Sequence, residues 1–523
     1  MRNIPICVSK KILADVSSGI YRTPANALKE LVSNAFDASA HRVFISTNYP
    51  YFDVFTCEDD GKGISAKEFE NIIKIIGSSE KRAEGNVTEE GRPIIGKIGI
   101  GLLAVAQICN KFTVISKKKG EDTYFEAVID IKQFDKVEKE KNYWKGTGEI
   151  SLGNCQIEDN LKDEVGSQRH YTKIIMEEIK EGFKLNLLKG ENIEIFSKNE
   201  KLFKFAKKAE KSEDFIKFIN SIKNKKFNEL SQYSQLIWEL GLLCPVEYVK
   251  NGPLPDNNII NYEVMKLKKN DFKVFIDGFE IFKPILFPTE KLTKENIDYK
   301  IYPHISFKEK VDNSELSFSG YIFHQRKKIQ PEKLQGLLIR IKGVAIGNYD
   351  RTFLHYPKAE GPMFSQISGE IFVENGLEEA LNIDRNSFNE THSHFLELQK
   401  FLWNYLGGKE GVFKDIRKRS NERQESVHIE KSELNISKAI ETVRSVFNIE
   451  IKLERKRNYS AEPYKYNKKE NKLILYSNPF WAKNYRERMV QERMVMYITV
   501  ARSISNSIDS FEKNIVKLFT YGK

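Results

Sequence analysis

The chain has 523 residues, of which 40% are hydrophobic and 30% charged, and its formal net charge is +11. One hydrophobic core does not organise this length, so we expect roughly two to four domains. No apolar run approaches the roughly 20 residues of a membrane-spanning helix, and the N-terminus lacks the apolar core of a signal peptide. We therefore expect a cytoplasmic protein without a membrane partner.

The cysteines and the net charge indicate little by themselves. The five cysteines are scattered and none forms a C-x-x-C pair, so neither a zinc site nor a disulfide framework is expected. The positive charge is compatible with a nucleic-acid partner. An abundance of lysine, isoleucine and asparagine along the whole chain, as a biased genome produces, explains it equally well.

The first predicted helix begins after Thr23, which suits an N-cap and is followed by Pro24 at the first helical position. Glu30, Asn34 and Asp37 lie at i, i+4 and i+7 of this helix and so form one stripe. An amide oxygen in such a stripe can bind Mg²⁺, and a carboxylate one turn earlier can polarise an attacking water. An ordinary exposed polar stripe has the same pattern.

Two glycine patterns follow. A strand-like segment leads into Asp59, Gly61 and Gly63 (D-x-G-x-G), where the carboxylate can accept a hydrogen bond from an exocyclic amine and the glycines admit a ligand to the backbone. A simple turn has this pattern too. Bare amides at a helix N-terminus cradle phosphates. The candidates for that role are Gly96, Gly99 and Gly101 (G-x-x-G-x-G) and, just upstream, Ser78, Ser79 and Lys81.

The order and spacing of these motifs resemble those of the GHKL ATPases, the superfamily of gyrase, Hsp90, histidine kinases and MutL. "ELVSNAFDA" (30–38) is similar to the Hsp90 form of the first motif. The resemblance covers residues 1 to about 180. It implies an α/β (α+β) fold, with a Bergerat-type sandwich in which helices cover a mixed sheet, and ATP and Mg²⁺ as cofactors.

The resemblance also implies roles for individual residues. Glu30 is the general base, Asn34 binds Mg²⁺ and Asp59 contacts adenine, while Asp37 and Thr172 support the base pocket. The glycines, serines and lysine between residues 61 and 101 surround the nucleotide. Tyr171 stands where the family has a glycine before the threonine. Glu30 distinguishes the chain from histidine kinases, which carry asparagine there.

The remaining chain has less distinctive patterns. We expect surface helices in the lysine-rich stretch at about 186–245, strands and turns over 257–350, a helix over 393–408, a charged helix or linker over 409–433, and a strand pair followed by a helix from about residue 480. The expected domains are an ATP-binding domain (1–185), a connector (186–250), an α/β middle domain (251–408), the charged linker (409–433) and a C-terminal domain for dimerisation or partner binding (434–523).

"LNIDRN" (381–386) resembles the Leu-Asn-Ile-Ser-Arg-Glu of the Hsp90 middle domain. By that resemblance Arg385 reaches the γ-phosphate as a catalytic cation and Asn382 lies beside the nucleotide. A structural Asp–Arg pair at a helix end fits the same six residues. In MutL, type II topoisomerases and MORC proteins a lysine contacts the γ-phosphate, and here Lys327, Lys328 and Lys333 are equally placed by sequence.

These resemblances predict an ATP-driven conformational switch, active as a homodimer, and leave three classes of partner. An Hsp90-like chaperone acting on a protein is favoured by the two Hsp90-like motifs. A MORC- or MutL-like DNA clamp is favoured by the basic charge and by the lysine-rich 204–226 stretch. The third class is a partner-dependent ATPase of a bacterial defence or stress system.

Overall fold

The computed structural model describes residues 23–74, 105–130, 154–162, 168–189, 212–222, 226–250, 258–287, 299–358, 360–382 and 386–447, together with short stretches between 452 and 521. The chain divides into two compact units, Met1–Trp403 and Asn404–Lys523. Among the described helices, none combines the length and the apolar character needed to cross a membrane.

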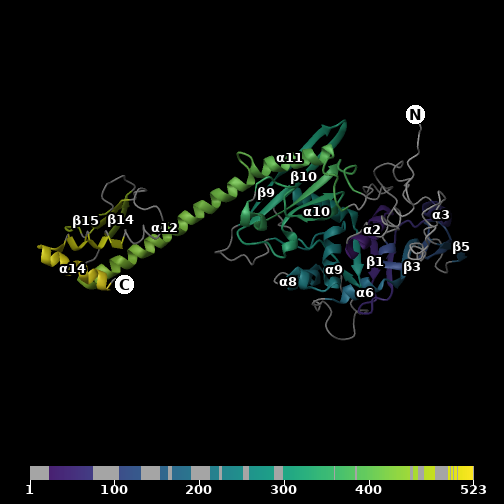
Figure 1. Cartoon of the computed structure of the whole chain (residues 1–523), viewed down its shortest axis with the longest axis horizontal. Coiled ribbons are helices and arrows are strands. Elements are labelled where there is room, and N and C mark those ends of the chain that lie inside the picture. Colours follow the sequence, from purple (N-terminus) through teal and green to yellow (C-terminus); the bar gives the residue numbers. More distant parts are fainter. Residues whose placement is uncertain are drawn as a thin grey trace, which may run out of the picture. The chain divides into compact units, whose positions relative to one another are not determined.

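The first unit is built on an eight-stranded sheet in the order β5-β4-β3-β6-β2-β1-β7-β8, whose elements are labelled in Figure 1. Strand β1 pairs antiparallel with β2 and parallel with β7, so the sheet is mixed, as predicted. Its strands are β1 (Arg42–Ser46), β2 (Phe55–Asp59), β3 (Cys109–Lys117), β4 (Thr123–Asp130), β5 (Asn154–Lys162), β6 (Tyr171–Ile179), β7 (Lys273–Ile276) and β8 (Phe279–Glu280).

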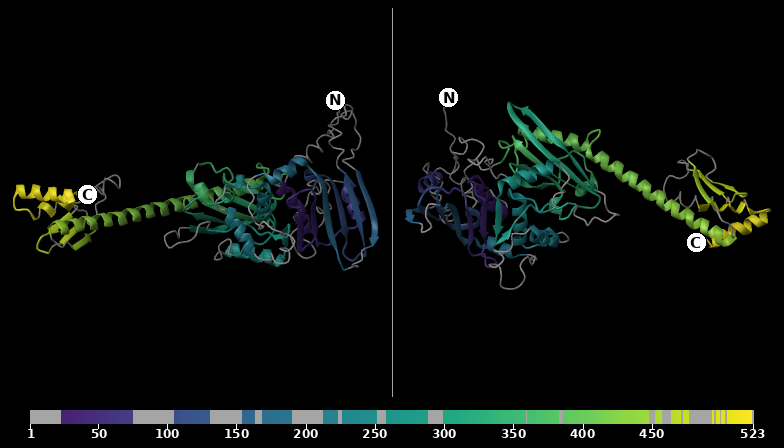
Figure 2. Two further views of the ribbon diagram at one scale, coloured as in Figure 1. Left: turned by 90° about the horizontal axis from the view of Figure 1, so that it is seen from below. Right: turned by 180° about the vertical axis from the view of Figure 1, so that it is seen from behind.

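Helices supply the apolar surface that one side of this sheet needs. They are α2 (Pro24–Asp37), α3 (Ala66–Lys74), α4 (Val105–Ile108), α6 (Glu181–Leu188), α8 (Ser212–Ile222), the 3-10 turn η4 (Phe227–Glu229), α9 (Gln232–Leu243) and α10 (Asn258–Asn270). Val43 and Ile45 of β1 point into the core that these helices share, whereas Phe44 faces outward. The sheet forms the purple and blue layer in Figure 2.

The hairpin of β7 and β8 joins this sheet although it lies in the part of the chain assigned by sequence to the middle domain. Its turn contains Asp277 and Gly278, both with positive φ. Asp277 accepts hydrogen bonds from the backbone N–H of Thr47 (2.8 Å) and from the hydroxyl of Tyr233 on α9 (2.6 Å). The turn thereby ties the sheet edge to α9.

Two expectations for the middle of the chain are wrong. Residues 258–270 form α10 instead of strands, because the buried Glu263 and Leu267 are one helical turn apart while Tyr262 and Met265 are exposed. In the stretch expected to form surface helices, α9 is buried along almost its whole length. Its "LIWELGLL" run is apolar on every side, which places it inside the fold.

A second, five-stranded sheet follows, in the order β12-β11-β13-β10-β9. One face includes Phe318, whose ring packs edge-on against Phe401 of α11. The opposite face includes Tyr321 and Leu338, which belong to the same core as α9 and the first sheet. Its elements are β9 (Tyr299–Val311), β10 (Ser314–Gln325), η5 (Glu332–Leu334), β11 (Gly336–Ile341), β12 (Val344–Asp350), η6 (Gly361–Gln366), β13 (Ile367–Asn375) and α11 (Ser393–Gly407).

The second unit contains the long helix α12 (Val412–Phe447), a three-stranded sheet in the order β14-β16-β15, and α14 (Ile508–Tyr521). Helix α12 confirms the charged helix at 409–433, and β15 (Tyr464–Asn467) and β16 (Lys472–Tyr476) confirm the strand pair, to which β14 (Lys452–Lys456) adds a third strand. The start of the helix expected from about residue 480 lies outside the described residues.

Candidate functional site

Helix α2 forms as its sequence predicts. The Thr23 hydroxyl accepts a hydrogen bond from the Asn26 N–H (3.4 Å), and Pro24 opens the helix. Of the polar stripe, Glu30 (3% exposed) and Asp37 (6% exposed) are buried, whereas Asn34 is exposed. The stripe thus runs from the interior to an accessible amide, which an ordinary solvated stripe does not do.

Glu30 has a cationic neighbour that sequence reasoning missed. Lys29 Nζ lies 3.6 Å from Glu30 Oε1, and both side chains are almost completely buried. Lys29 Nζ also donates to Asn386 Oδ1 (3.0 Å), which belongs to the segment that follows β13. The buried carboxylate is therefore next to a contact between the ATPase-like region and the second sheet's extension.

Asp59 ends strand β2 and begins a tight turn. Its Oδ1 accepts from the Gly61 N–H (2.9 Å), and a Cβ on Gly61 would lie 2.8 Å from the same oxygen. Gly63 has a φ of +62°, and a Cβ there would lie 2.0 Å from the Lys117 carbonyl oxygen. Glycine is therefore required at Gly63 both by the backbone conformation and by the close approach of β3.

The structure brings Asp59 beside Thr172, as the resemblance implies. The two residues are directly opposite in the antiparallel pairing of β2 with β6. Ser116 of β3 was not predicted, yet its hydroxyl lies 3.0 Å from Thr172 Oγ1 and accepts from the Ile64 N–H (3.0 Å). Burial raises the pKa of the Asp59 carboxyl to about 7. A carboxyl so enclosed is suited to bind a directed donor such as an exocyclic amine.

His170 is a further residue near this turn that the motifs did not include. Its Nδ1 lies 2.7 Å from the Gly61 carbonyl oxygen. Arg169 stacks over the ring of Tyr171, the residue that replaces the family's glycine, at 4.7 Å from the ring centroid. The segment 169–172 thus holds the Asp59 turn from the neighbouring strand.

The remaining predicted nucleotide contacts lie outside the described residues. These are Ser78, Ser79, Lys81, Gly96, Gly99, Gly101 and, in the second half, Arg385. Their roles stay predictions.

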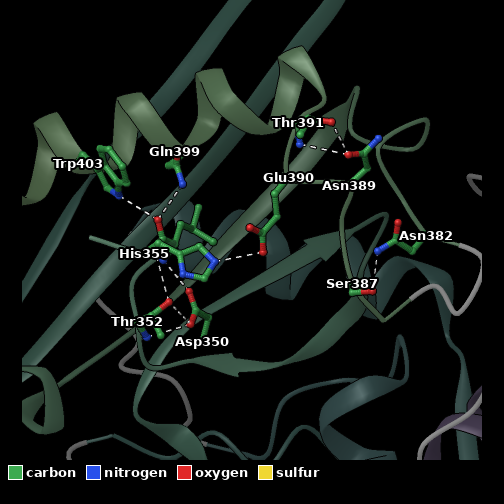
Figure 3. Close-up of polar contacts among 11 residues, drawn as sticks. Asp350, Thr352, His355, Asn382, Ser387, Asn389, Glu390, Thr391, Gln399 and Trp403 are labelled. Carbon is green, nitrogen blue, oxygen red and sulfur yellow. Dashed lines mark hydrogen bonds and ion pairs between the residues drawn. The ribbon is translucent and has the colours of Figure 1, made fainter. Parts of the chain in front are cut away.

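Asn382 closes a short loop in front of the second sheet. Its backbone N–H donates to the Ser387 carbonyl (3.0 Å), and its Nδ2 donates to the Ser387 hydroxyl (2.8 Å). The two residues flank positions 383–386, so this pair closes the loop that carries Arg385 in the sequence. Figure 3 shows the Asn382–Ser387 contact at one end of a larger polar cluster.

That cluster connects the loop to α11. His355 Nε2 lies 3.1 Å from Glu390 Oε1, and Figure 3 shows the two side chains directed at each other. His355 ends a turn in which Phe353, Leu354 and His355 all have positive φ. The Leu354 carbonyl accepts from Trp403 Nε1 (3.0 Å) and also from Gln399 Nε2. Residues with side chains are strained in this conformation and persist only where their surroundings hold them.

Two of the three lysines considered for the γ-phosphate have protein partners. Lys333 Nζ lies 3.6 Å from Glu239 Oε1 on α9, and Lys328 is paired with Glu332 one turn of chain away. The side chain of Lys327 has no contact from which a role follows.

The residues present are compatible with Mg²⁺. Among the described residues, no group of three or more His, Cys, Asp or Glu side chains is arranged to hold a metal ion. Mg²⁺ needs no such group, because it usually keeps several waters and takes one or two protein oxygens plus substrate phosphates. The exposed Asn34 amide, one turn from the buried Glu30, suits that mode.

Comparison with known proteins agrees with this geometry. Residues 21–172 match the family model described as "Histidine kinase-, DNA gyrase B-, and HSP90-like ATPase". The matched region begins just before α2 and ends at Thr172, so it contains every predicted N-terminal site residue.

Relatives fall into two groups by extent. The chaperone protein HtpG of Clostridium perfringens is 23% identical over 443 residues, which covers 78% of this chain and 64% of that protein. HtpG of Bacillus velezensis is 31% identical over 134 residues, 22% of this chain and 21% of that protein. The DNA mismatch repair protein MutL of Acidiphilium cryptum is 31% identical over 113 residues, 21% of this chain and 18% of that protein. The chain thus spans less than two thirds of the length of these relatives.

Proposed function

Residues 21–172 belong to the GHKL ATPase superfamily, and on that premise we propose that this chain binds ATP with Mg²⁺, hydrolyses it, and uses the cycle as a conformational switch. The observation that carries the proposal is the placement of Glu30. It is buried on α2, one turn from the accessible Asn34, and beside a residue of the segment that follows the second sheet. A base, a metal ligand and a second-domain contact meet at one helix.

The described residues divide the work as follows. Glu30 accepts a proton from the attacking water, since a carboxylate held away from solvent is an effective general base. Asp59, supported by Thr172 and Ser116, accepts a hydrogen bond from the adenine amine. Mg²⁺, when held by Asn34 and the phosphates, supplies charge neutralisation on the transferred phosphoryl group.

The second sheet completes the site in this proposal. Asn386 contacts Lys29, and Arg385 precedes it in the chain. An arginine delivered there stabilises the charge that develops on the γ-phosphate, because a preorganised cation acts most strongly in a site that excludes water. Docking of this segment then couples hydrolysis to the arrangement of the two sheets.

The partner we propose is a protein, as for an Hsp90-like chaperone. The HtpG match supports this choice because it extends far beyond the ATPase region, over 78% of the chain, whereas the MutL match covers 21%. A DNA clamp is the second candidate, and the net charge of +11 and the MutL likeness support it.

The primary test is the variant Glu30→Ala, compared with Glu181→Ala, which removes an exposed glutamate on α6. We expect Glu30→Ala to bind ATP with nearly unchanged affinity and to lose turnover by about 10² to 10⁴-fold. Binding is measured by calorimetry and turnover by phosphate release. Undiminished turnover in Glu30→Ala would refute its role as the base.

The partner class is tested by steady-state ATP hydrolysis with and without double-stranded DNA over a range of salt. Stimulation that fades as salt rises would establish the clamp, because phosphate contacts release counterions. Turnover indifferent to DNA, together with suppression of aggregation of an unfolded model protein, is the result expected for the chaperone.

A further inference from the structure

A fully buried ion pair lies in the second sheet, on the face that shares a core with α9. Arg340 of β11 is 1% exposed and Glu370 of β13 is 0% exposed, and Arg340 Nε donates to Glu370 Oε1 at 2.5 Å. The parallel register of the two strands sets Leu338 opposite Glu370 and Arg340 opposite Phe372, which places both charged side chains on one face.

Each member of the pair also bonds to an element outside the second sheet. Arg340 Nη1 donates to the carbonyl oxygen of Leu242 (2.8 Å), near the C-terminal end of α9. Glu370 Oε2 accepts from the hydroxyl of Tyr248 (3.0 Å), in the segment that follows α9. The pair therefore fixes two strands of the sheet to the end of one helix.

A second buried cation reinforces the same place. Lys283 Nζ donates to the carbonyl oxygens of Cys244 (2.9 Å) and Val246 (2.6 Å). The last carbonyls of a helix have no partner within it and carry partial negative charge. Arg340 and Lys283 satisfy such carbonyls from two different parts of the chain, so the end of α9 has one defined position.

Stability alone is a weak reason for this arrangement. Removing two charges from water is so unfavourable that well-packed apolar replacements of a buried ion pair are often as stable or more stable. The best-attested benefit of such a pair is that it selects one arrangement of the elements it joins. Here those elements are the second sheet and α9.

The selected arrangement includes the candidate site. Helix α9 packs against α2, which carries Lys29 and Glu30. Strand β13, which carries Glu370, continues through residues 376–382 toward Asn386, and Asn386 accepts a hydrogen bond from Lys29. Two routes, one through α9 and one through β13, therefore run from the Arg340–Glu370 pair to the same turn of α2.

We propose that Arg340 and Glu370 are positioning residues that set the placement of the segment after β13 against Glu30, and so govern turnover without touching the nucleotide. This role rests on the proposed ATPase activity of the Glu30 site. Because the pair is remote from the nucleotide, it affects how often the complete site forms and not how tightly the nucleotide binds.

The test uses the full chain with both charges replaced, Arg340→Met together with Glu370→Leu. The exposed pair Lys328–Glu332, changed to alanine at both positions, is the control. We expect the buried double variant to keep its melting temperature and its ADP affinity while turnover falls at least tenfold. The exposed double variant should match the wild type in all three.

A readout independent of activity accompanies these measurements. Hydrogen exchange without nucleotide should be faster in segment 386–391 of the buried double variant and unchanged in α11. If the wild type neither binds nor hydrolyses ATP, the proposed function fails, yet this exchange difference still decides whether the pair positions the segment. Wild-type exchange and wild-type turnover in the buried double variant would overturn the proposal.

Tyr248→Phe decides the question if the double variant does not fold. It deletes the hydroxyl that Glu370 accepts from and leaves the ion pair in place. We expect a smaller decrease in turnover, of about twofold to fivefold, with unchanged ADP affinity and faster exchange in 386–391. No change in turnover and no change in exchange would contradict the positioning role.

Discussion

Lys29 and Asn386 are 357 positions apart in the chain, and Lys29 Nζ donates a 3.0 Å hydrogen bond to Asn386 Oδ1. Lys29 is 1% exposed, so this bond forms in an environment from which water is largely excluded. It joins the helix of the proposed base to the segment that brings Arg385, and four predictions concern this bond and its surroundings.

The Lys29–Asn386 contact is expected to contribute to turnover and not to nucleotide binding. Lys29→Met and Asn386→Ala should each lower kcat by about tenfold, because each removes the same link near Glu30. Since the two residues share one hydrogen bond, the double variant should lose much less than the product of the single losses. Single-turnover kinetics on the four proteins measures this coupling, and fully multiplicative losses would show that the residues act independently.

Arg385 is expected to act on the γ-phosphate. Arg385→Ala should lower turnover by roughly 10² to 10³-fold, the range for loss of one preorganised transition-state contact, with little change in ADP affinity. Arg417→Ala, which removes an exposed arginine of α12, serves as the control. If Arg385→Ala leaves turnover unchanged, the Hsp90-like docking of the second sheet on the nucleotide fails.

Asp59 is expected to make both stability and nucleotide affinity depend on pH. Its folded-state pKa is raised to about 7 by burial, above its ordinary value of 3.8. The unfolded chain therefore binds fewer protons than the folded chain between these values, so the contribution of Asp59 to stability is present below about pH 4 and is lost as the pH rises through 7.

The variant Asp59→Asn isolates this effect. Relative to the wild type, its melting temperature should rise as the pH increases from 5 to 8. ADP affinity of the wild type should increase over the same interval because the ionised carboxylate is the better acceptor for the adenine amine. The variant should show only the pH dependence that comes from ADP itself. Parallel pH profiles for the two proteins would contradict the assignment.

Gly63 is expected to tolerate no side chain. Gly63→Ala places a Cβ 2.0 Å from the Lys117 carbonyl oxygen and at a φ of +62°, so we expect the free energy of unfolding to fall by about 2 kcal/mol or more. Gly120→Ala is the matched control, because Gly120 has a φ of +87° but open space around it. Denaturant unfolding of both variants separates the steric contact from the backbone strain. Equal losses would show that the contact with β3 relaxes freely.

Local features of the site were predictable from sequence because local forces produce them. The Thr23 cap, the stripe on α2 and the turn after Asp59 depend on helical period and on the conformational freedom of glycine. The same reasoning failed for α10, where a helix of mixed character lies between strand-like segments. Its pattern became clear only from which side chains are buried.

The sequence by itself determined the motif residues, their order and the superfamily that they indicate. Only the tertiary structure decided that Asp59 lies opposite Thr172, that the β7–β8 hairpin completes the first sheet, and that Lys29 contacts Asn386. Strand pairing and contacts between distant segments follow from the joint burial of many apolar side chains, which no short pattern encodes. The site depends on both, because its chemical groups come from motifs and their placement comes from packing.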